Sequence, residues 1–459
     1  MSKKRRTKTT ESKVSIQQLP PDVLVKLIRW VSDTSSVFSL LSALDTPTAR
    51  DLLEPLWQLS LKLEHSTLWP VLHLQRSTLV NSTSHFEAIL PLYPHVVNQY
   101  VFNLDWLDQH LHPATTMTWQ SIPNDDDDDD EQVLPLDEWY RRWSMMFRTT
   151  RLELSERHLD HLVAVLPSCH HLLHLSLTNS TCTTTDALCA WLPTSNVIEL
   201  CLVGLDDGDS LVLFTRVMLQ HIHQWLETRP VRLLQLNHCC WEHSDEDVGN
   251  FFRSIFHSPT LTSFSLTQCR LPIRFQLPHP FSPTLRKLAL RGCQHMTHNH
   301  IVAVARALVG SNVTHLCIGR SQIVPDNTSL ELVFDALPHT KMLDLDLSGC
   351  GLVNIDHLTK FLRTDSHLET LVLDDNPIGD EGAQKIAQAI QSHPTLCNIH
   401  VAKCNLAFEG AMALVTLPFK PLKRLLLGRM GKIWGNDWEK LQELAKARNV
   451  ELNFAACHR

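Results

Sequence analysis

The chain has 459 residues, of which 43% are hydrophobic, which is enough for two or three domains or for one long array of repeats. Its formal net charge of −8 falls to about −1 without the acidic run 125–131, so no nucleic-acid-binding surface is indicated. No run of about 18 apolar residues occurs, which argues against a membrane-spanning helix. We therefore expect a soluble, folded protein.

The N-terminal tail, residues 1–13, is short and basic, and no apolar signal segment follows it. Lys3 to Lys8 could act as a nuclear-import signal or only as a solubilising tail. The 13 cysteines are odd in number, and most recur at one place in the repeat described below. We therefore expect reduced, buried thiols, which predicts a cytoplasmic protein and leaves nuclear entry open.

Residues 14–64 are predicted to form a small helical module. Leu19 and Pro20 precede a first helix, because proline suits the first turn, where its missing N–H is not needed. A second helix is expected to start near Ser35, and a third apolar stretch is interrupted by Pro55. The apolar residues of the three segments are Val23, Leu24, Leu27, Ile28 and Val31; Val37, Leu40, Leu41 and Leu44; and Leu52, Leu53, Leu56 and Trp57.

The sequence Leu-Pro-Pro-Asp-Val-Leu at 19–24 and the Leu-Trp pair at 56–57 resemble the F-box, a helical module that docks on the Skp-type adaptor of a cullin ubiquitin ligase. The Val-Cys-x-x-(Phe/Trp) element usual in that family is missing from residues 41–50. The resemblance implies that Trp57 helps to hold the module together. An alternative is a helical cap that closes the end of a repeat array. The residues that the resemblance would place against the adaptor are Leu19, Pro20, Val23, Leu24 and Ile28.

The segment between this module and the repeats carries no motif that points to a function. Residues 65–112 are predicted to be a helical connecting region of unknown role. Residues 113–136 are predicted to be an acidic linker, because the run Asp125 to Glu131 repels itself and has no apolar residue. From Trp139 the chain is apolar again, and we expect the N-terminal cap of a solenoid that spans residues 137–459.

A repeat dominates the second half of the sequence. From Leu368 the chain follows the pattern L-x-x-L-x-L-x-x-N-x-I, and the same frame, with Cys at the Asn position, starts at Leu261, Met342 and Leu396. With weaker copies there are about twelve units, spaced by roughly 23 to 34 residues. The weaker copies centre on Leu152, Leu175, Leu200, Leu234, Leu288, Leu316, Leu425 and Leu452.

Each unit is predicted to be a strand, a turn and a helix. Leu371 and Leu373 would point inward from a short strand, and the Asn or Cys that follows would bond the free backbone groups of the bend. Residues 380–390 have apolar side chains at helical spacing. The cysteines expected at the bend are Cys239, Cys269, Cys293, Cys350 and Cys404.

No unit can bury its apolar face alone, so the units must stack into an α/β solenoid with parallel strands on the concave side and helices on the convex side. Residues 368–383 resemble the ribonuclease-inhibitor type of leucine-rich repeat. The units with Cys at the bend resemble the cysteine-containing repeats of F-box proteins. The two resemblances cover roughly residues 149–454.

The sequence shows no catalytic, cofactor or metal motif. The densest group of possible metal ligands is His238, Cys239, Cys240 and His243, but a structural zinc site normally needs paired C-x-x-C spacing, which is missing from this chain. There is no phosphate-binding loop, no G-x-G-x-x-G and no G-x-S-x-G. We therefore expect no enzyme activity, no cofactor and no metal.

The concave surface is the predicted binding site for a partner protein. Lys287 and Arg291, with Arg320 nearby, would form a basic zone beside an acidic zone of Asp344, Asp346 and Asp374. Such polarity would select a protein of complementary charge. Nucleic acid and membrane are not expected as partners.

These features favour the substrate receptor of a Skp–cullin–F-box ubiquitin ligase. An alternative is a stand-alone leucine-rich-repeat scaffold or regulator, similar to the Ran GTPase-activating proteins, although those place an acidic stretch after the repeats.

Overall fold

The computed structural model describes residues 20–123, 134–155, 159–180, 182–204, 211–242, 245–272, 277, 280–320, 328–416, 422–428 and 436–453. The chain divides into two compact units, residues 1–172 and residues 173–459, which we call the N-terminal unit and the C-terminal unit. Within the described residues, no helix is long and apolar enough to cross a membrane.

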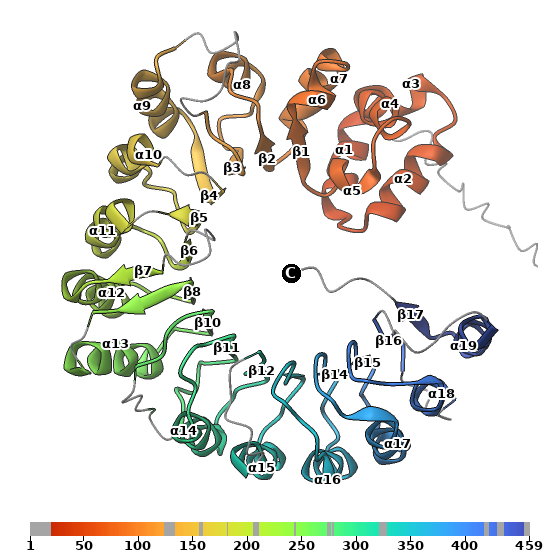
Figure 1. Ribbon diagram of the computed structural model, residues 1–459. Coiled ribbons are helices and arrows are strands. Elements are labelled where there is room, and N and C mark those ends of the chain that lie inside the picture. The colour runs from red at the N-terminus through yellow and green to blue at the C-terminus, as the bar shows by residue number, and fades with distance from the viewer. Residues whose placement is uncertain are drawn as a thin grey trace, which may run out of the picture. The chain divides into compact units, whose positions relative to one another are not determined.

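The N-terminal unit begins with a bundle of short helices, α1 to α5 (Figure 1). Pro20, in extended conformation, precedes α1, and the Asp33 side chain accepts the N–H of Ser36 at 2.8 Å to cap α2. Pro55 lies in the first turn of α4, so it starts this helix rather than interrupting it. The helices are α1 (Pro21–Trp30), α2 (Thr34–Ala43), α3 (Pro47–Arg50), η2 (Asp51–Leu53), α4 (Glu54–Ser60), α5 (His65–Leu68), α6 (Arg76–Leu79), α7 (Thr83–Ile89), η3 (Leu90–Leu92), α8 (Leu104–His110), α9 (Leu136–Met146), α10 (Asp160–Val165) and η4 (Leu166–Ser168).

A parallel sheet follows the bundle within the same unit, and here the sequence-based boundaries were wrong. Residues 65–112, predicted to be helical, contain β1 and β2, and β3 lies inside the predicted linker 113–136. Neighbouring strands pair in parallel from β1 to β4. The acidic run itself lies outside the described residues. The strands are β1 (Leu72–Gln75), β2 (His95–Gln99), β3 (Thr116–Trp119) and β4 (Arg148–Leu154).

The first strand–helix units escaped detection because their chemistry differs from that of the later ones. Their inward side chains are mixed, with Leu72 and Leu74 in β1 but Met117 and Trp119 in β3. The predicted cap near Trp139 is instead the helix between β3 and β4, and its Trp139 and Trp143 rings each lie 5.8 Å from the ring of Trp119. Such large rings fill the core where later repeats use leucine.

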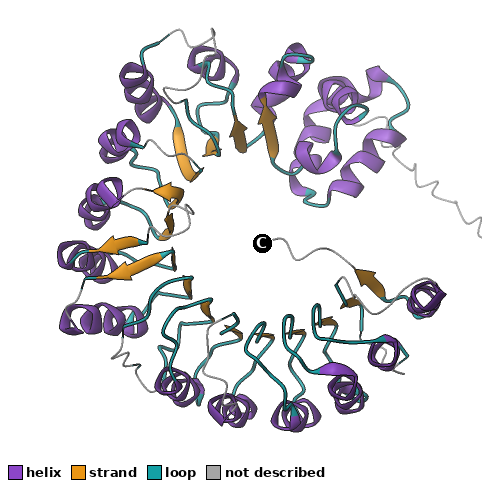
Figure 2. Ribbon diagram, in the orientation of Figure 1, coloured by secondary structure: helices purple, strands orange, loops and turns teal. Residues whose placement is uncertain are grey.

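The C-terminal unit is the predicted solenoid. Its parallel strands line the concave side and its helices the convex side (Figures 1 and 2). The strand order is β5-β6-β8-β10 and then β11 to β17 in sequence, while β7 and β9 form a separate two-stranded sheet. The strands are β5 (His174–Ser180), β6 (Glu199–Gly204), β7 (Val212–Phe214), β8 (Leu233–Asn237), β9 (Cys239–Trp241), β10 (Ser263–Thr267), β11 (Lys287–Arg291), β12 (His315–Cys317), β13 (Asp344–Asp346), β14 (Thr370–Val372), β15 (Asn398–His400), β16 (Arg424–Leu426) and β17 (Glu451–Asn453).

The register stacks the repeats one upon another. Leu371 of β14 lies opposite Leu345 of β13 and Ile399 of β15, and all three are fully buried. This confirms the alternation of buried and outward residues that the repeat predicts. The helices of this unit are α11 (Cys182–Trp191), η5 (Leu192–Thr194), α12 (Arg216–Thr228), α13 (Asp245–His257), α14 (His298–Leu308), α15 (Thr328–Ala336), η6 (Leu337–His339), α16 (Asp356–Thr364), α17 (Gly379–Ile390), α18 (Phe408–Val415) and α19 (Asn436–Ala447).

The Cys or Asn after a strand joins its repeat to the preceding one. Cys404 Sγ donates to the carbonyl of Leu373 at 3.1 Å, one repeat back, and Asn376 Nδ2 donates to Leu347 O at 2.9 Å. Cys269, Cys293 and Cys350 make the same kind of bond at 3.3 to 3.6 Å. The five cysteines predicted at the bend are buried and free of disulfide bonds. Four of them bond a carbonyl of the preceding repeat, as the sequence predicts, whereas Cys239 begins β9 and bonds the carbonyl of Asn237 in its own repeat.

We expect Asn376→Ala to lower the free energy of unfolding by about 2–4 kcal/mol. The substitution leaves the carbonyl of Leu347 and the N–H of Leu352 without their buried partners and removes one of the two side-chain donors to the carbonyl of Leu373. Urea denaturation followed by circular dichroism measures the change. The control is Asn398→Ala, which removes only a half-buried bond to the Thr370 hydroxyl and should cost at most about 1 kcal/mol. Equal losses in the two variants would contradict the role given to the bend residue.

Candidate partner-binding surfaces

The first helix presents one apolar stripe to the core and another to solvent. Leu24 and Ile28 are only 2% and 1% exposed, so they pack inside the module, and the prediction that they meet an adaptor was wrong. Helical periodicity predicts that apolar residues line one side of the helix. Where two such rows adjoin, periodicity alone does not tell which row faces the core. Leu19 lies outside the described residues.

The solvent side of the same helix carries a second row of apolar residues among charged ones, and we call Pro20, Val23, Leu27 and Trp30 the α1 stripe. Pro20 is exposed and Val23 half-buried. Leu27 is 46% and Trp30 89% exposed. Their spacing of three or four residues places them on one side of α1. Two of the five predicted adaptor residues thus lie on an accessible surface, and Leu27 and Trp30 extend it.

Trp57 lies where it can hold the helical module together. The guanidinium carbon of Arg50 sits 4.7 Å from the centre of the Trp57 ring. Arg50 is buried, donates to the carbonyl of Leu41 at 3.0 Å and forms an ion pair with Glu54 at 3.0 Å. This one side chain therefore ties α2, α3 and α4 together.

The concave surface of the C-terminal unit is shallowly hollowed where β10 to β14 lie side by side. The hollow has a volume of about 230 Å³. Ser265, Ala289 and Cys317 occupy successive strands at one register position and form its floor. Burial raises the pKa of the Cys317 thiol to about 12, so the thiol stays protonated and donates to Asp346 at 3.3 Å. We call this feature the inner hollow.

Two of the predicted acidic residues are bonded within the solenoid. Asp374 is only 8% exposed and accepts the N–H of Ala402 at 2.7 Å, and burial raises the pKa of its carboxyl above the usual range. Asp346 accepts the N–H of Ser348 at 2.9 Å. Asp374 therefore links its repeat to the next one, and Asp346 stabilises the bend within its own repeat. The prediction that Asp374 faces a partner was wrong.

The remaining charged residues of the predicted site do face the concave side. Asp344 is half-buried and lies 2.8 Å from His315 on the neighbouring strand. Lys287 and Arg320 are exposed and Arg291 is half-buried. The side chains of these three cations form no hydrogen bond or ion pair with any residue that the structure describes. The basic zone is therefore available to a partner.

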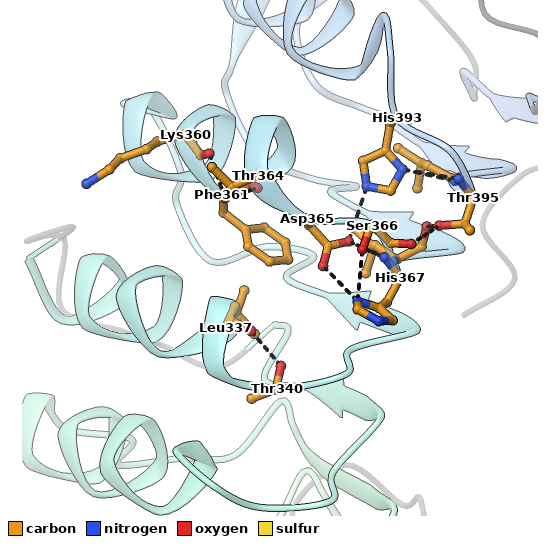
Figure 3. Close-up of polar contacts among 12 residues, drawn as sticks. Leu337, Thr340, Lys360, Phe361, Thr364, Asp365, Ser366, His367, His393 and Thr395 are labelled. Atoms are coloured by element: carbon orange, nitrogen blue, oxygen red, sulfur yellow. Dashed lines mark hydrogen bonds and ion pairs between the residues drawn. The ribbon is translucent and has the colours of Figure 1, made fainter.

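A buried Asp–His pair lies elsewhere in the solenoid, at the ends of the helices that precede β14 and β15 (Figure 3). His393 Nε2 lies 3.2 Å from Asp365 Oδ2, and the two side chains are 0% and 4% exposed. Asp365 also accepts the N–H of Leu368 at 2.7 Å, and His393 Nδ1 accepts the N–H of Leu396 at 3.2 Å. The pair therefore caps the turns that follow α16 and α17.

Serine caps the corresponding turn in other repeats, at the same position or one residue later. Ser258 accepts the N–H of Leu261 at 3.3 Å, and Ser195 accepts the N–H of Val197 at 3.2 Å. The acid and the imidazole meet because stacking brings the caps of successive repeats together. A structural role is therefore sufficient to explain both residues.

Among the described residues, no three His, Cys, Asp or Glu side chains gather closely enough to hold a metal ion. Of the group considered from the sequence, His243 lies outside the described residues. Cys239 is buried and donates to the carbonyl of Asn237 at 3.1 Å.

Comparisons with known proteins agree with the repeat architecture. A family model for the leucine-rich repeat matches residues 364–387, which contain β14. The human protein NACHT, LRR and PYD domains-containing protein 2 is 32% identical over 120 residues, which are 25% of this chain and only 11% of that protein. With its parallel strands and outer helices, the chain has an α/β leucine-rich-repeat solenoid fold.

Two solved structures are also similar, each at 14% identity. The complex of TLR13 with ssRNA13 has a TM-score of 0.35, with 67% of this chain and 45% of that chain covered. The complex of Rad7 and Elc1 in yeast has a TM-score of 0.43, with 91% of this chain and 89% of that chain covered.

The Asp365–His393 pair predicts a pH-dependent contribution to stability. Burial alone would raise the pKa of Asp365, but the hydrogen bonds from His393 and from the N–H groups of Leu368 and His367 outweigh it and lower the pKa. A lowered pKa in the folded state means that the stabilisation is present above about pH 4 and is lost as the pH falls through the lowered value.

We therefore expect Asp365→Asn to lower the free energy of unfolding by about 1–2 kcal/mol at neutral pH, because a neutral amide oxygen is a weaker acceptor than the carboxylate oxygen that meets His393 and two backbone N–H groups. Urea denaturation at a series of pH values should show this difference shrinking below about pH 4. Asp335→Asn is the control, since Asp335 is 57% exposed beside His357 and should contribute at most about 0.5 kcal/mol. A difference that stays constant with pH would contradict the account.

Proposed function

We propose that this chain is a non-enzymatic protein-binding scaffold, and that it serves as the substrate receptor of a Skp–cullin–F-box ubiquitin ligase. The α1 stripe would dock on the Skp-type adaptor, and the concave surface of the solenoid would hold the protein to be modified. The chain itself would perform no chemistry and need no cofactor. Its buried, reduced cysteines fit a cytoplasmic protein, with nuclear entry left open.

The observation that carries the proposal is the α1 stripe. A soluble protein gains nothing by exposing 89% of a tryptophan beside a half-exposed leucine unless a partner covers them. Tryptophan is enriched among the residues that contribute most to binding. A helix that merely capped a solenoid would need only its inner face, formed by Leu24 and Ile28, to be apolar.

The connection between the module and the sheet supports the same proposal. Trp69 Nε1, which directly precedes the first strand–helix unit, donates to the carbonyl of Val31 at 2.6 Å, and Arg29 Nε donates to Leu92 O at 3.1 Å. These bonds hold the end of α1 against the start of the sheet within the N-terminal unit. A firmly held helix loses little conformational freedom when a partner binds.

We expect the double substitution Leu27→Ala with Trp30→Ala to weaken capture of a purified Skp-type adaptor by about a hundredfold, since each side chain contributes about 1–2 kcal/mol when buried. Biolayer interferometry with the full chain measures the affinity. The matched control is Leu61→Ala with Val80→Ala, two side chains of the same unit that are 62% and 69% exposed.

Loss in the α1 variant alone, with unchanged circular dichroism, is the expected result. If the unsubstituted chain does not bind the adaptor, or if both variants bind it equally well, the ligase assignment is wrong. The chain would then be a stand-alone scaffold whose helical module has another role.

A further inference from the structure

The carboxylates and the cations on the concave surface of the C-terminal unit differ in their hydrogen bonding. Each carboxylate on its described strands already has a partner: Glu199 lies 2.9 Å from His174, Asp344 lies 2.8 Å from His315, and Glu451 lies 2.9 Å from Arg424. Asp346 and Asp374 are bonded to backbone N–H groups. In contrast, the side chains of Lys287, Arg291 and Arg320 have no such partner among the described residues.

Lys287 lines the inner hollow, and Arg291 lies on the same strand toward its other end. Lys287 and Arg291 start and end β11 and, four residues apart, point to the same face at a separation of about 13 Å. Arg320 follows the next strand, and its Cγ lies 3.3 Å from where a Cβ of Gly349 would be. This glycine therefore leaves room for the arginine stem where the chain bends after β13.

The floor between these cations is small and mostly uncharged. Ser265, Ala289 and Cys317 leave a hollow whose volume of about 230 Å³ equals roughly seven or eight water molecules. Val372 forms an apolar part of its wall, and Asp344 and Asp346 line the side away from Lys287. The hollow therefore has room for an apolar side chain, and Lys287 at its edge can meet a carboxylate.

We propose that the concave surface of β10 to β13 binds an acidic segment of a partner protein. The segment would be extended, with carboxylates against Lys287, Arg291 and Arg320 and an apolar side chain in the inner hollow. This inference names the class of partner held by the solenoid. It rests on the part of the proposed function that assigns the partner to the concave surface, and not on the adaptor.

A protein segment fits this surface better than a nucleic acid does. Single-stranded nucleic acids are usually bound by exposed aromatic rings and a long basic track. Here the aromatic ring nearest the hollow, Phe264, is fully buried, and the track consists of three cations in a chain with a net charge of −8. The bonded acids from Asp344 onward would repel a longer polyanion and so limit the acidic segment to one side of the hollow.

The test is a selection of peptides from a random display library on the immobilised full chain. We expect the enriched peptides to combine Asp or Glu with a neighbouring aliphatic residue. A fluorescein-labelled enriched peptide then serves as the probe for affinity by fluorescence polarisation. Its binding to the Lys287→Glu, Arg291→Glu double variant should be at least about tenfold weaker. Binding to the unsubstituted chain should weaken as salt rises from about 0.05 to 0.3 M.

The matched control is Lys360→Glu with Arg363→Glu, two exposed cations of α16 that change the net charge by the same amount (Figure 3 shows Lys360). Its affinity should stay within about twofold of that of the unsubstituted chain. Enrichment of neutral or basic peptides, or equal weakening in both variants, would overturn the proposal. The proposal would also be overturned if a single-stranded RNA probe bound the unsubstituted chain more tightly than the peptide does and the Lys287→Glu, Arg291→Glu variant lost that binding.

Adaptor capture by the Lys287→Glu, Arg291→Glu variant separates this inference from the proposed function. Retained capture together with lost peptide binding supports both. Retained capture with no dependence of peptide binding on Lys287 and Arg291 overturns only the inference.

Discussion

The hydrogen bond from the bend residue of one repeat to a carbonyl of the preceding repeat is the interaction on which the solenoid depends. Each strand must end in a sharp turn inside the core, where an unpaired carbonyl would be costly. The Cys404 thiol and the Asn376 amide satisfy such carbonyls and, at the same time, fix the register of neighbouring units. Without this bond the leucine layers could not stack so closely.

This constraint separates the residues that build the fold from those free to bind. The inward leucines and the bend residues cannot be substituted without disturbing the fold, whereas the residues at the outward positions of the strands can vary without changing it. The structure divides even these outward positions, because Asp374 and Asp346 are held by backbone N–H groups while Lys287 is not. Binding specificity therefore lies in a small subset of the concave surface.

The repeats from Leu261 onward could be predicted from the sequence, because their inward leucines and their Cys or Asn follow one fixed spacing. The strands β1 to β3 could not, since Met117 and Trp119 take the place of leucine in β3 and no Cys or Asn follows these strands at the spacing of the pattern. A strand can be recognised from the sequence only where its core positions carry the leucine and the Cys or Asn that the repeat pattern requires.

The binding residues were only partly predictable, for a different reason. Periodicity placed Leu24 and Leu27 on the same apolar helix, yet only tertiary packing decides that Leu24 is buried and Leu27 exposed. Alternation along β14 placed Asp374 outward, but the backbone N–H of Ala402 from the next repeat captures its carboxylate. In both cases the outcome depends on contacts with residues of another helix or of the next repeat, which the local sequence pattern does not specify.

The central claim is that two separate surfaces, the α1 stripe and the inner hollow, bind two different partners. The most direct measurement is light scattering coupled to size-exclusion chromatography of the chain mixed with a Skp-type adaptor and with an acidic peptide fused to a carrier protein. The account predicts one ternary complex that contains one copy of each. Two binary complexes in which adaptor and peptide displace each other would contradict it.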